Sequence, residues 1–494
     1  MNSVPNAIDP SVNHNSQIIL SRKIRFLLFC ILSFIGSILM LSNSVFSASV
    51  TVIKSELNLT NRQFGMFGSF LGIGHICGSL IYIILSGIFS RKYLFLLSLV
   101  ICSCSHLFFF VTKYFYFLLL IRLMAGIGQS IGFCYLPTWV EQFAIRKYKS
   151  WMITILNIAE NFGQIWGYLF SLILTPVKWK YNLLFETSSI LIFLPILLLI
   201  HKKYFNKELI SDGTANKLCE SQRDTNQDKK EPSNFTVFRT IEEVDRKKVQ
   251  NSYSNDDNNN NIIENFSQKK KQRAYLKHKF CLLIINIQYI SLLFCKSVEN
   301  FINTAQTFWY SDYIQDAFKI KNDLKIFKSF TSSYVIAPIC GVLISGFIVS
   351  RLGGYYSLKS LAMMTIFSII TSGIAIYAGF TKNFINFTIF NILFNLSYNI
   401  SSNFIILLSV EELPPTMKGY ALGLFQFALQ FLAFFPAPLA YAEIKLYFNS
   451  SKIAMQILMS YSAVGSLCII WCLINKICKR IKGRGKKKLV EVIV

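Results

Sequence analysis

The segment from Arg122 to Pro137, RLMAGIGQSIGFCYLP, places one arginine in a long apolar run beside three glycines. A charge at the centre of a membrane helix costs about 2.5 to 3.5 kcal/mol on insertion scales, so Arg122 is expected to face the interior of a helical bundle. Gly126, Gly128 and Gly132 remove side chains on successive turns, which lets a neighbouring helix or a substrate approach the backbone. The segment predicts a transporter interior; the simpler interpretation is a helix-packing motif with a snorkelling arginine.

The composition excludes an ordinary soluble protein. Of the 494 residues, 53% are hydrophobic and 15% are charged, which indicates a polytopic membrane protein. The net charge of +25 comes from basic residues at helix ends, in the C-terminal tail and in one central segment. Cytoplasmic topology explains this charge better than nucleic-acid binding does. The twelve cysteines lie mostly in apolar runs and show no disulfide spacing.

Twelve segments are long and apolar enough to cross a membrane, since a crossing needs roughly twenty apolar residues. They are Phe26–Val50, Phe64–Phe89, Tyr93–Thr112, Tyr114–Val140, Trp151–Pro176, Asn182–His201, Cys281–Tyr310, Phe327–Ser350, Leu358–Phe380, Asn383–Val410, Tyr420–Tyr441 and Ile453–Ile474. The predicted fold is all-α and integral to the membrane, with six helices in each of two halves.

The two sixes are separated by a polar segment that holds about a third of the basic residues, about half of the acidic ones and an asparagine run. Its composition is typical of a disordered linker. The predicted organisation is 1–23 as an N-terminal tail, 24–201 and 280–475 as the six-helix halves, 202–279 as the linker and 476–494 as a basic tail. Because Lys and Arg gather in the tails and the linker, all three are expected in the cytosol.

The two halves carry similar turns after their second helices. One turn reads GIFSRK and ends in Arg91 and Lys92; the other reads GFIVSRLGG and contains Gly346, Arg351 and Gly353. A basic side chain in such a turn can reach the carbonyls at a helix C-terminus and hold a gate between helices. Paired halves around a linker are one way in which secondary transporters are built.

These motifs resemble the major facilitator superfamily, and several resemble its Spinster-type lipid transporters. The arginine followed by Gly-x-Gly is similar to the fourth-helix motif of the superfamily. Ala159, Gly163 and Gly167 in the fifth helix, Trp309 and Tyr313 ending the seventh, and the eleventh-helix run from Gly419 to Pro438 are similar to Spinster patterns. The resemblance implies sphingolipid-like or lysophospholipid-like amphiphilic substrates.

Two acidic positions of that family are neutral in this chain. The family has an Asp-Arg pair near Ser42 and Asn43 and a glutamate at the position of Gln129. Since the resemblance assigns proton coupling to such acids, their loss favours uncoupled transport, with Glu160 as the alternative proton carrier.

Polar faces on four helices suggest a central cavity, because unpartnered amides in hydrocarbon are costly. The candidate substrate-binding residues are Arg122, Gln129, Asn157, Glu160, Asn161, Gln164, Lys296, Glu299, Asn303 and Gln426. Asn391, Asn395, Asn399 and Asn403 form a stripe at four-residue steps, for which interhelical hydrogen bonding is the competing interpretation. Lys296 and Glu299 are expected to form an internal ion pair, and His75 and His106 to be isolated packing residues.

The sequence predicts a transporter of an amphiphilic or organic-anion substrate that works by alternating access, with Arg122 and Lys296 attracting a negative head group. A pantothenate-type carboxylate permease and a receptor that has lost transport are the alternatives. No phosphate loop, nucleophile elbow or metal-ligand spacing is recognisable in the sequence, so we expect no enzyme, no metal and no cofactor. The expected partners are the bilayer and a small-molecule or lipid substrate, with a monomeric chain.

Overall fold

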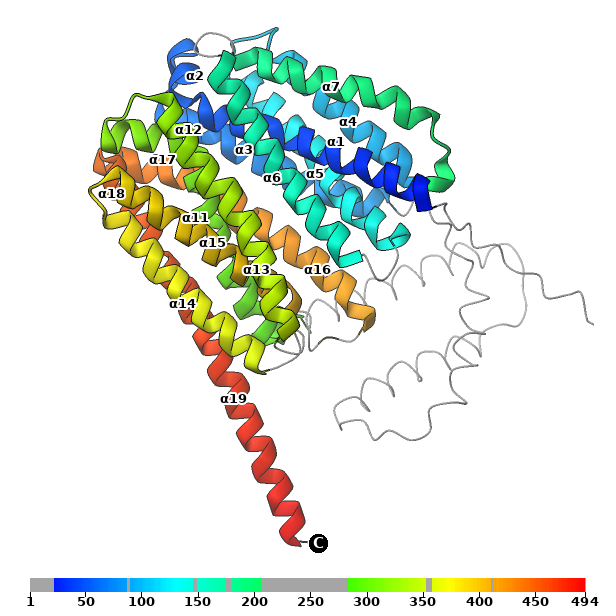
Figure 1. The fold of residues 1–494 in the computed structure, drawn as a ribbon, viewed down its shortest axis with the longest axis vertical. Coiled ribbons are helices and arrows are strands. Elements are labelled where there is room, and N and C mark those ends of the chain that lie inside the picture. Colours follow the sequence, from blue (N-terminus) through cyan, green and yellow to red (C-terminus); the bar gives the residue numbers. More distant parts are fainter. Residues whose placement is uncertain are drawn as a thin grey trace, which may run out of the picture. The chain divides into compact units, whose positions relative to one another are not determined.

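The computed structural model describes residues 22–86, 89–144, 149–174, 179–205, 283–351, 358–409, 413 and 415–493. The chain divides into two units: 1–206 together with 286–494, and 207–285, of which only residues 283–285 are described. The first unit holds both halves of the helical bundle (Figure 1). The predicted tail 1–23 and linker 202–279 lie almost entirely outside the described residues.

The N-terminal half supplies six crossings, the first of which is interrupted near Ser49. Its helices are α1 (Arg22–Ala48), α2 (Val50–Glu56), α3 (Asn61–Leu85), α4 (Arg91–Phe108), α5 (Phe115–Phe143), α6 (Lys149–Leu174) and α7 (Trp179–Leu199), followed by the short helix η1 (Lys202–Tyr204).

The C-terminal half supplies six more crossings, three of them built from more than one helical segment. Its helices are α11 (Ile287–Phe318), α12 (Asp323–Thr331), η2 (Ser332–Ile336), α13 (Ala337–Arg351), α14 (Leu358–Phe380), α15 (Phe384–Ser409), α16 (Pro415–Leu429), η3 (Gln430–Phe434), α17 (Pro436–Phe448), α18 (Ser451–Ser460) and α19 (Ser462–Ile493). The twelve predicted crossings are therefore confirmed.

Two crossings contain a π-helical turn just before a proline. The turn η2 precedes Pro338, and η3 precedes Pro436. Proline has no backbone N–H, so the regular ladder of hydrogen bonds cannot pass through it. In η3 the amide of Phe435 donates to the carbonyl of Gln430 instead, five residues earlier. Such local widening of a helix is frequent where a helix serves a function.

Nine helical stretches in the described part of the chain are long and apolar enough to span a membrane. The three crossings not among them are α6, α11 and α15, which carry the polar faces predicted from the sequence: Glu160 and Asn161, Lys296 and Glu299, and the asparagine stripe. Polar side chains inside these three crossings lower their hydropathy, and such side chains normally face a protein interior rather than lipid.

Glycines allow the helices of the N-terminal half to touch backbone to backbone. A Cβ atom added at Gly126 would lie 2.3 Å from the carbonyl oxygen of Leu71, and one at Gly74 would lie 2.3 Å from that of Leu123. A Cβ atom at Gly163 would lie 1.9 Å from the carbonyl oxygen of Ser37, where α6 crosses α1. The predicted close approach at Gly126 is therefore present, and α3 is the partner helix.

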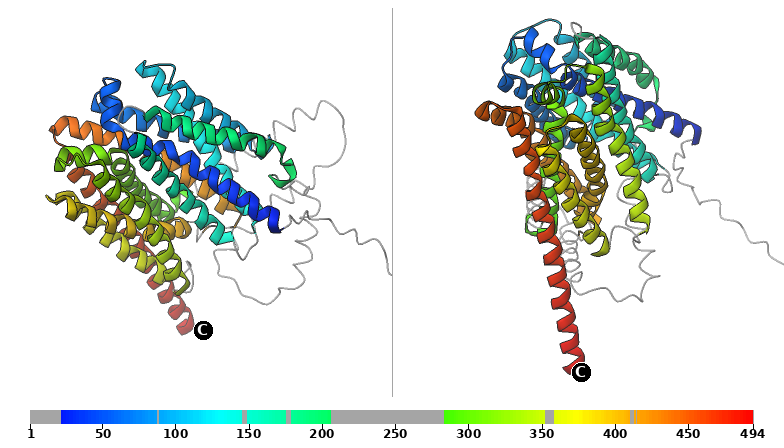
Figure 2. Two further views of the ribbon diagram at one scale, coloured as in Figure 1. Left: turned by 45° about the horizontal axis from the view of Figure 1, so that its top comes forward. Right: turned by 60° about the vertical axis from the view of Figure 1, so that its left-hand side comes forward.

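The last helix ends later in the sequence than predicted. The sequence predicts the twelfth crossing to stop near Ile474, but α19 continues as one helix to Ile493, through the basic tail. Figures 1 and 2 show this helix extending well past the rest of the bundle. Lysine and arginine are good helix formers, so a run rich in them continues a helix that the apolar segment has already nucleated.

Candidate functional site

The two halves are joined by polar contacts near the end of the bundle where α1 and α2 finish. The hydroxyl of Ser47 donates to the carbonyl of Thr307, and the hydroxyls of Tyr168 and Ser311 are hydrogen-bonded. Asp312 accepts from Lys54 at 3.3 Å across the halves, and from Lys445 at 2.7 Å within its own half. We call this set of contacts the seal.

Apolar packing reinforces the seal where α3 meets α17 and α11. The Phe64 ring lies 5.2 Å from that of Phe308 and 5.4 Å from that of Trp309, measured between centroids. A Cβ atom added at Gly65 would lie 3.0 Å from the Cβ of Ala442, so these helices touch closely. The two halves are closed against each other at this end, and α2, α12 and α17 gather there in Figure 1.

Arg122 lies in the bundle interior, as its position in α5 predicts. The residue is 1% exposed, and its guanidinium stacks on the ring of Phe46 with the carbon 3.9 Å from the centroid. Its Nε is 3.5 Å from the carbonyl oxygen of Phe67, while one terminal nitrogen has no partner among the described residues. The side chain does not snorkel, and its charge needs an acid nearby.

Gln129 links three helices through a neutral network. Its amide nitrogen donates to the Ser42 hydroxyl at 3.0 Å, and its amide oxygen lies 3.2 Å from Nε2 of His75. The oxygen accepts, so His75 carries its proton on Nε2. His75 is therefore a satisfied packing residue, as expected. Ser42 and Gln129, which stand at or next to the positions where Spinster-type transporters carry acids, are both part of this network.

The expected ion pair between Lys296 and Glu299 is absent. The Lys296 ammonium donates to Ser402 at 2.7 Å and lies 4.1 Å from the centre of the Tyr398 ring. The Glu299 carboxylate accepts from Ser401 at 3.4 Å. Both side chains turn to α15 rather than to each other, because α15 offers each a hydroxyl. Lys296 is 3% exposed, and no carboxylate is within ion-pair distance of it in the described part of the chain.

The other candidate residues lie on three helices, α6, α11 and α16, and differ in how deeply they are buried. Glu160, Asn161 and Gln164 are half-buried on α6, and Asn303 is half-buried on α11 with its amide oxygen unpartnered. Gln426 on α16 is exposed, which does not fit a residue enclosed with the others. Asn157 lies on α6, but its side chain is outside the described residues.

The described asparagines of the stripe on α15 make hydrogen bonds both to another helix and within α15 itself. Asn391 donates to the Tyr334 hydroxyl at 3.3 Å, which joins α15 to η2. Asn395 and Asn399 donate to carbonyls one turn earlier in their own helix, at 3.0 and 2.8 Å. Interhelical hydrogen bonding, the competing interpretation from the sequence, is therefore seen at Asn391, whereas Asn395 and Asn399 bond within α15. The Asn403 side chain is not described.

Of the residues in the two predicted gating turns, the structure describes side-chain contacts for Lys92. The Lys92 ammonium donates to the carbonyls of Leu198, at 2.9 Å, and of Ile200, at the end of α7. A basic residue after the second crossing thus reaches helix C-terminal carbonyls, within its own half. Arg91 begins α4, while Gly346 and Arg351 lie in α13 without described side chains. Gly353 is outside the described residues.

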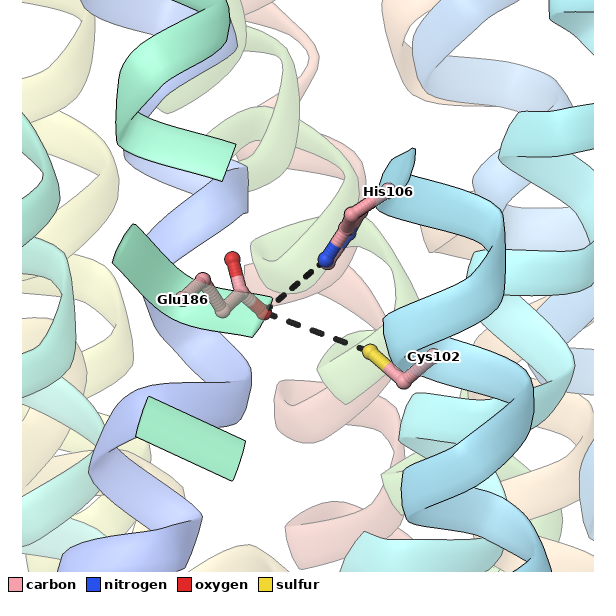
Figure 3. A group of neighbouring side chains, drawn as sticks. All are labelled: Cys102, His106 and Glu186. Atoms are coloured by element: carbon pink, nitrogen blue, oxygen red, sulfur yellow. Dashed lines mark hydrogen bonds and ion pairs between the residues drawn. The ribbon is translucent and has the colours of Figure 1, made fainter. Parts of the chain in front are cut away.

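A buried cluster that the sequence interpretation missed lies between α4 and α7 (Figure 3). Glu186 is fully buried, with one carboxylate oxygen 3.6 Å from Nδ1 of His106 and 4.0 Å from Sγ of Cys102. Arg122 is close enough to interact electrostatically with all three residues, although it makes no ion pair with Glu186 among the described contacts. His106 is therefore not an isolated histidine. The sequence does contain a signal for this cluster, because Glu186 is the one acidic residue in the apolar run 179–199 and a buried acid in a membrane helix needs partners.

Twelve crossings in two halves that close on each other at one end define a polytopic membrane transporter. The family description of the Major Facilitator Superfamily matches residues 32–438, and the chain belongs to that family.

Several solved structures share this fold. A bacterial homologue of the human lysosomal transporter Spinster, inward-facing and unoccupied, has a TM-score of 0.67 at 10% identity over 92% of this chain and 98% of that one. The nucleoside transporter NupG gives 0.58 at 14% identity over 91% and 98%. The inward open xylose transporter XylE from E. coli gives 0.60 at 13% identity over 91% and 95%. No curated protein matches the sequence.

Proposed function

We propose that this transporter carries an amphiphilic anion by alternating access, and that Lys296 attracts the negative head group. The observation that carries the proposal is the Lys296 ammonium, buried and without a carboxylate within ion-pair distance among the described residues. Burying an unpaired charge is expensive, so such a cation is suited to a substrate that supplies the opposite charge.

The amphiphilic part of the proposal rests on the Spinster-like motifs and on the similarity of the fold to the bacterial Spinster homologue. A short-chain carboxylate permease remains the second candidate, because Lys296 would also attract a small anion. The two differ in what surrounds the head group: a lipid-like substrate needs apolar contacts for its tail, whereas a short carboxylate needs further hydrogen bonds.

Counterflow into proteoliposomes tests the proposal. Vesicles preloaded with a lysophospholipid anion should accumulate the labelled form, and vesicles preloaded with a short carboxylate, a sugar or a nucleoside should not accumulate theirs. Lys296→Gln should abolish the uptake, whereas Lys452→Gln, which removes an exposed lysine on α18, should leave it unchanged. Uptake of the short carboxylate alone would favour the permease, and no uptake of any compound would favour a receptor.

We further propose that both tails and the 202–279 linker are cytosolic and that the chain works as a monomer. The lysines and arginines of these segments support this orientation. Protease added outside sealed vesicles whose cytosolic face is outward should cut the linker. A protected linker would contradict the orientation, and a dimer in light scattering would contradict the monomer.

A further inference from the structure

The buried cluster of Cys102, His106 and Glu186 contains three different metal-ligating groups. Cys102 and His106 are four residues apart and so share a face of α4, while Glu186 comes from the adjacent α7. All three are completely buried. Figure 3 shows their side chains converging on the space between the two helices.

The distances between the ligand atoms are close to, and in part longer than, the edges of a tetrahedral site. The carboxylate oxygen Oε1 of Glu186 is 3.6 Å from Nδ1 of His106 and 4.0 Å from Sγ of Cys102, and all the ligand atoms lie within 4.8 Å of one another. Zinc bonds of about 2.0 to 2.3 Å place tetrahedral ligands about 3.3 to 3.8 Å apart. Small side-chain movements would bring the three atoms onto one ion.

The state of His106 is an independent indication of a ligand. Neither ring nitrogen makes a hydrogen bond to any described residue, although the side chain is fully buried. A buried imidazole normally has partners, because an unpaired polar group costs about 1 to 3 kcal/mol. An ion bound through Nδ1 would provide one.

We propose that Cys102, His106 and Glu186 bind a transition-metal ion of the Zn²⁺ class, which ties α4 to α7 inside the N-terminal half. A thiolate together with an imidazole favours zinc over the hard cations Mg²⁺ and Ca²⁺. Binding displaces the thiol proton of Cys102 to the solvent, since the thiolate is the ligand. The thiolate and the carboxylate then neutralise the ion, and Arg122 keeps its positive charge beside the site.

The site lies within one half of the bundle. Helices α4 and α7 pack mainly against α5, α1, α6 and each other, all of which belong to the N-terminal half. The ion is therefore a fixed part of this half rather than cargo. This inference does not depend on the identity of the transported substrate.

Metal content of the purified full-length protein tests the proposal. Protein stripped with a chelator, exposed to Zn²⁺ and desalted should retain about one zinc ion per chain and unfold at a higher temperature. Cys102→Ser and His106→Asn should lose the ion and the thermal shift. Cys104→Ser, on an exposed part of the same helix, and His75→Asn, at a buried histidine of α3, should keep both.

A spectroscopic measurement covers the case in which a variant fails to fold. Co²⁺ in the wild-type site should give a thiolate-to-cobalt charge-transfer band together with a tetrahedral absorption spectrum. Absence of the band in folded wild-type protein would overturn the proposal. Zinc content that is unchanged by Cys102→Ser but lowered by Cys104→Ser would also overturn it, because the ion would then sit on other cysteines.

Discussion

Gln129 donates a hydrogen bond to the hydroxyl of Ser42, 3.0 Å away, and so joins α5 to α1 with neutral groups. In the family that the sequence resembles, the corresponding positions carry acids. A neutral pair cannot gain and lose a proton during a transport cycle, which is why we expect transport down the substrate gradient alone.

This expectation predicts flux that does not respond to an imposed pH gradient. Substrate uptake by wild-type proteoliposomes, and by Glu160→Gln, should be the same with and without the gradient. Acceleration that is lost only in Glu160→Gln would identify Glu160 as a proton carrier. Acceleration of both proteins would reject uncoupled transport and Glu160 together.

Arg122 and Glu186 should be coupled in stability. Arg122→Gln leaves Glu186 as an uncompensated buried charge, and Glu186→Gln does the same to Arg122. The double variant removes both charges, so it should be more stable than the sum of the single losses predicts, by about 0.5 to 3 kcal/mol. Thermal unfolding of the four proteins, without added metal, measures this coupling; additive losses would mean that another group balances Arg122.

Asp316, at the end of α11, should contribute the same stability at pH 5 as at pH 7. Its partial burial would raise its pKa, but hydrogen bonds from Ser451, Lys445 and Lys319 and the Lys445 charge lower the pKa to about 2. A depressed pKa stabilises the folded state above the ordinary value of 3.8, and this contribution is lost as the pH falls towards 2. The melting-temperature difference between wild type and Asp316→Asn should be constant from pH 7 to pH 5; a difference that vanishes by pH 5 would contradict these contacts.

Gly126→Ala should destabilise the protein, whereas Gly373→Ala should not. A Cβ at Gly126 would meet the Leu71 carbonyl at 2.3 Å, but at Gly373 there is nothing within 4 Å. Forcing a methyl group into a packed contact costs about 1 to 3 kcal/mol, while alanine in an open helical position is favoured over glycine. Melting temperatures in detergent compare the two, and equal values would mean that α3 and α5 do not touch at Gly126.

The crossings and the buried arginine could be predicted because each depends on local sequence. Length and hydropathy mark a crossing, and a single cation within a crossing must face inward. The close helix contact at Gly126 could also be predicted, because the small residues that permit it follow one another along a single helix.

Side-chain partners could not be predicted, because they come from other helices. Lys296 and Glu299 are three residues apart, which favours an ion pair, yet the hydroxyls of Ser402 and Ser401 on α15 draw them apart. Glu186 has no charged neighbour along α7, and the groups that interact with it lie on α1, α4 and α5. Only the fold brings Cys102 and His106 to it.

The central claim, transport by opening and closing of the two halves, is tested most directly by locking the seal. In the pair Gly65→Cys and Ala442→Cys, the Cβ atoms would lie 3.0 Å apart, which is shorter than the roughly 3.5 to 4.5 Å of a disulfide, so a small separation of α3 and α17 allows the bond to form. When reduced, the double variant should transport the lysophospholipid anion. When oxidised, its uptake should fall to that of empty liposomes, and reductant should restore it. Transport by each single variant should not change on oxidation. Full-rate transport by the cross-linked protein would contradict the claim.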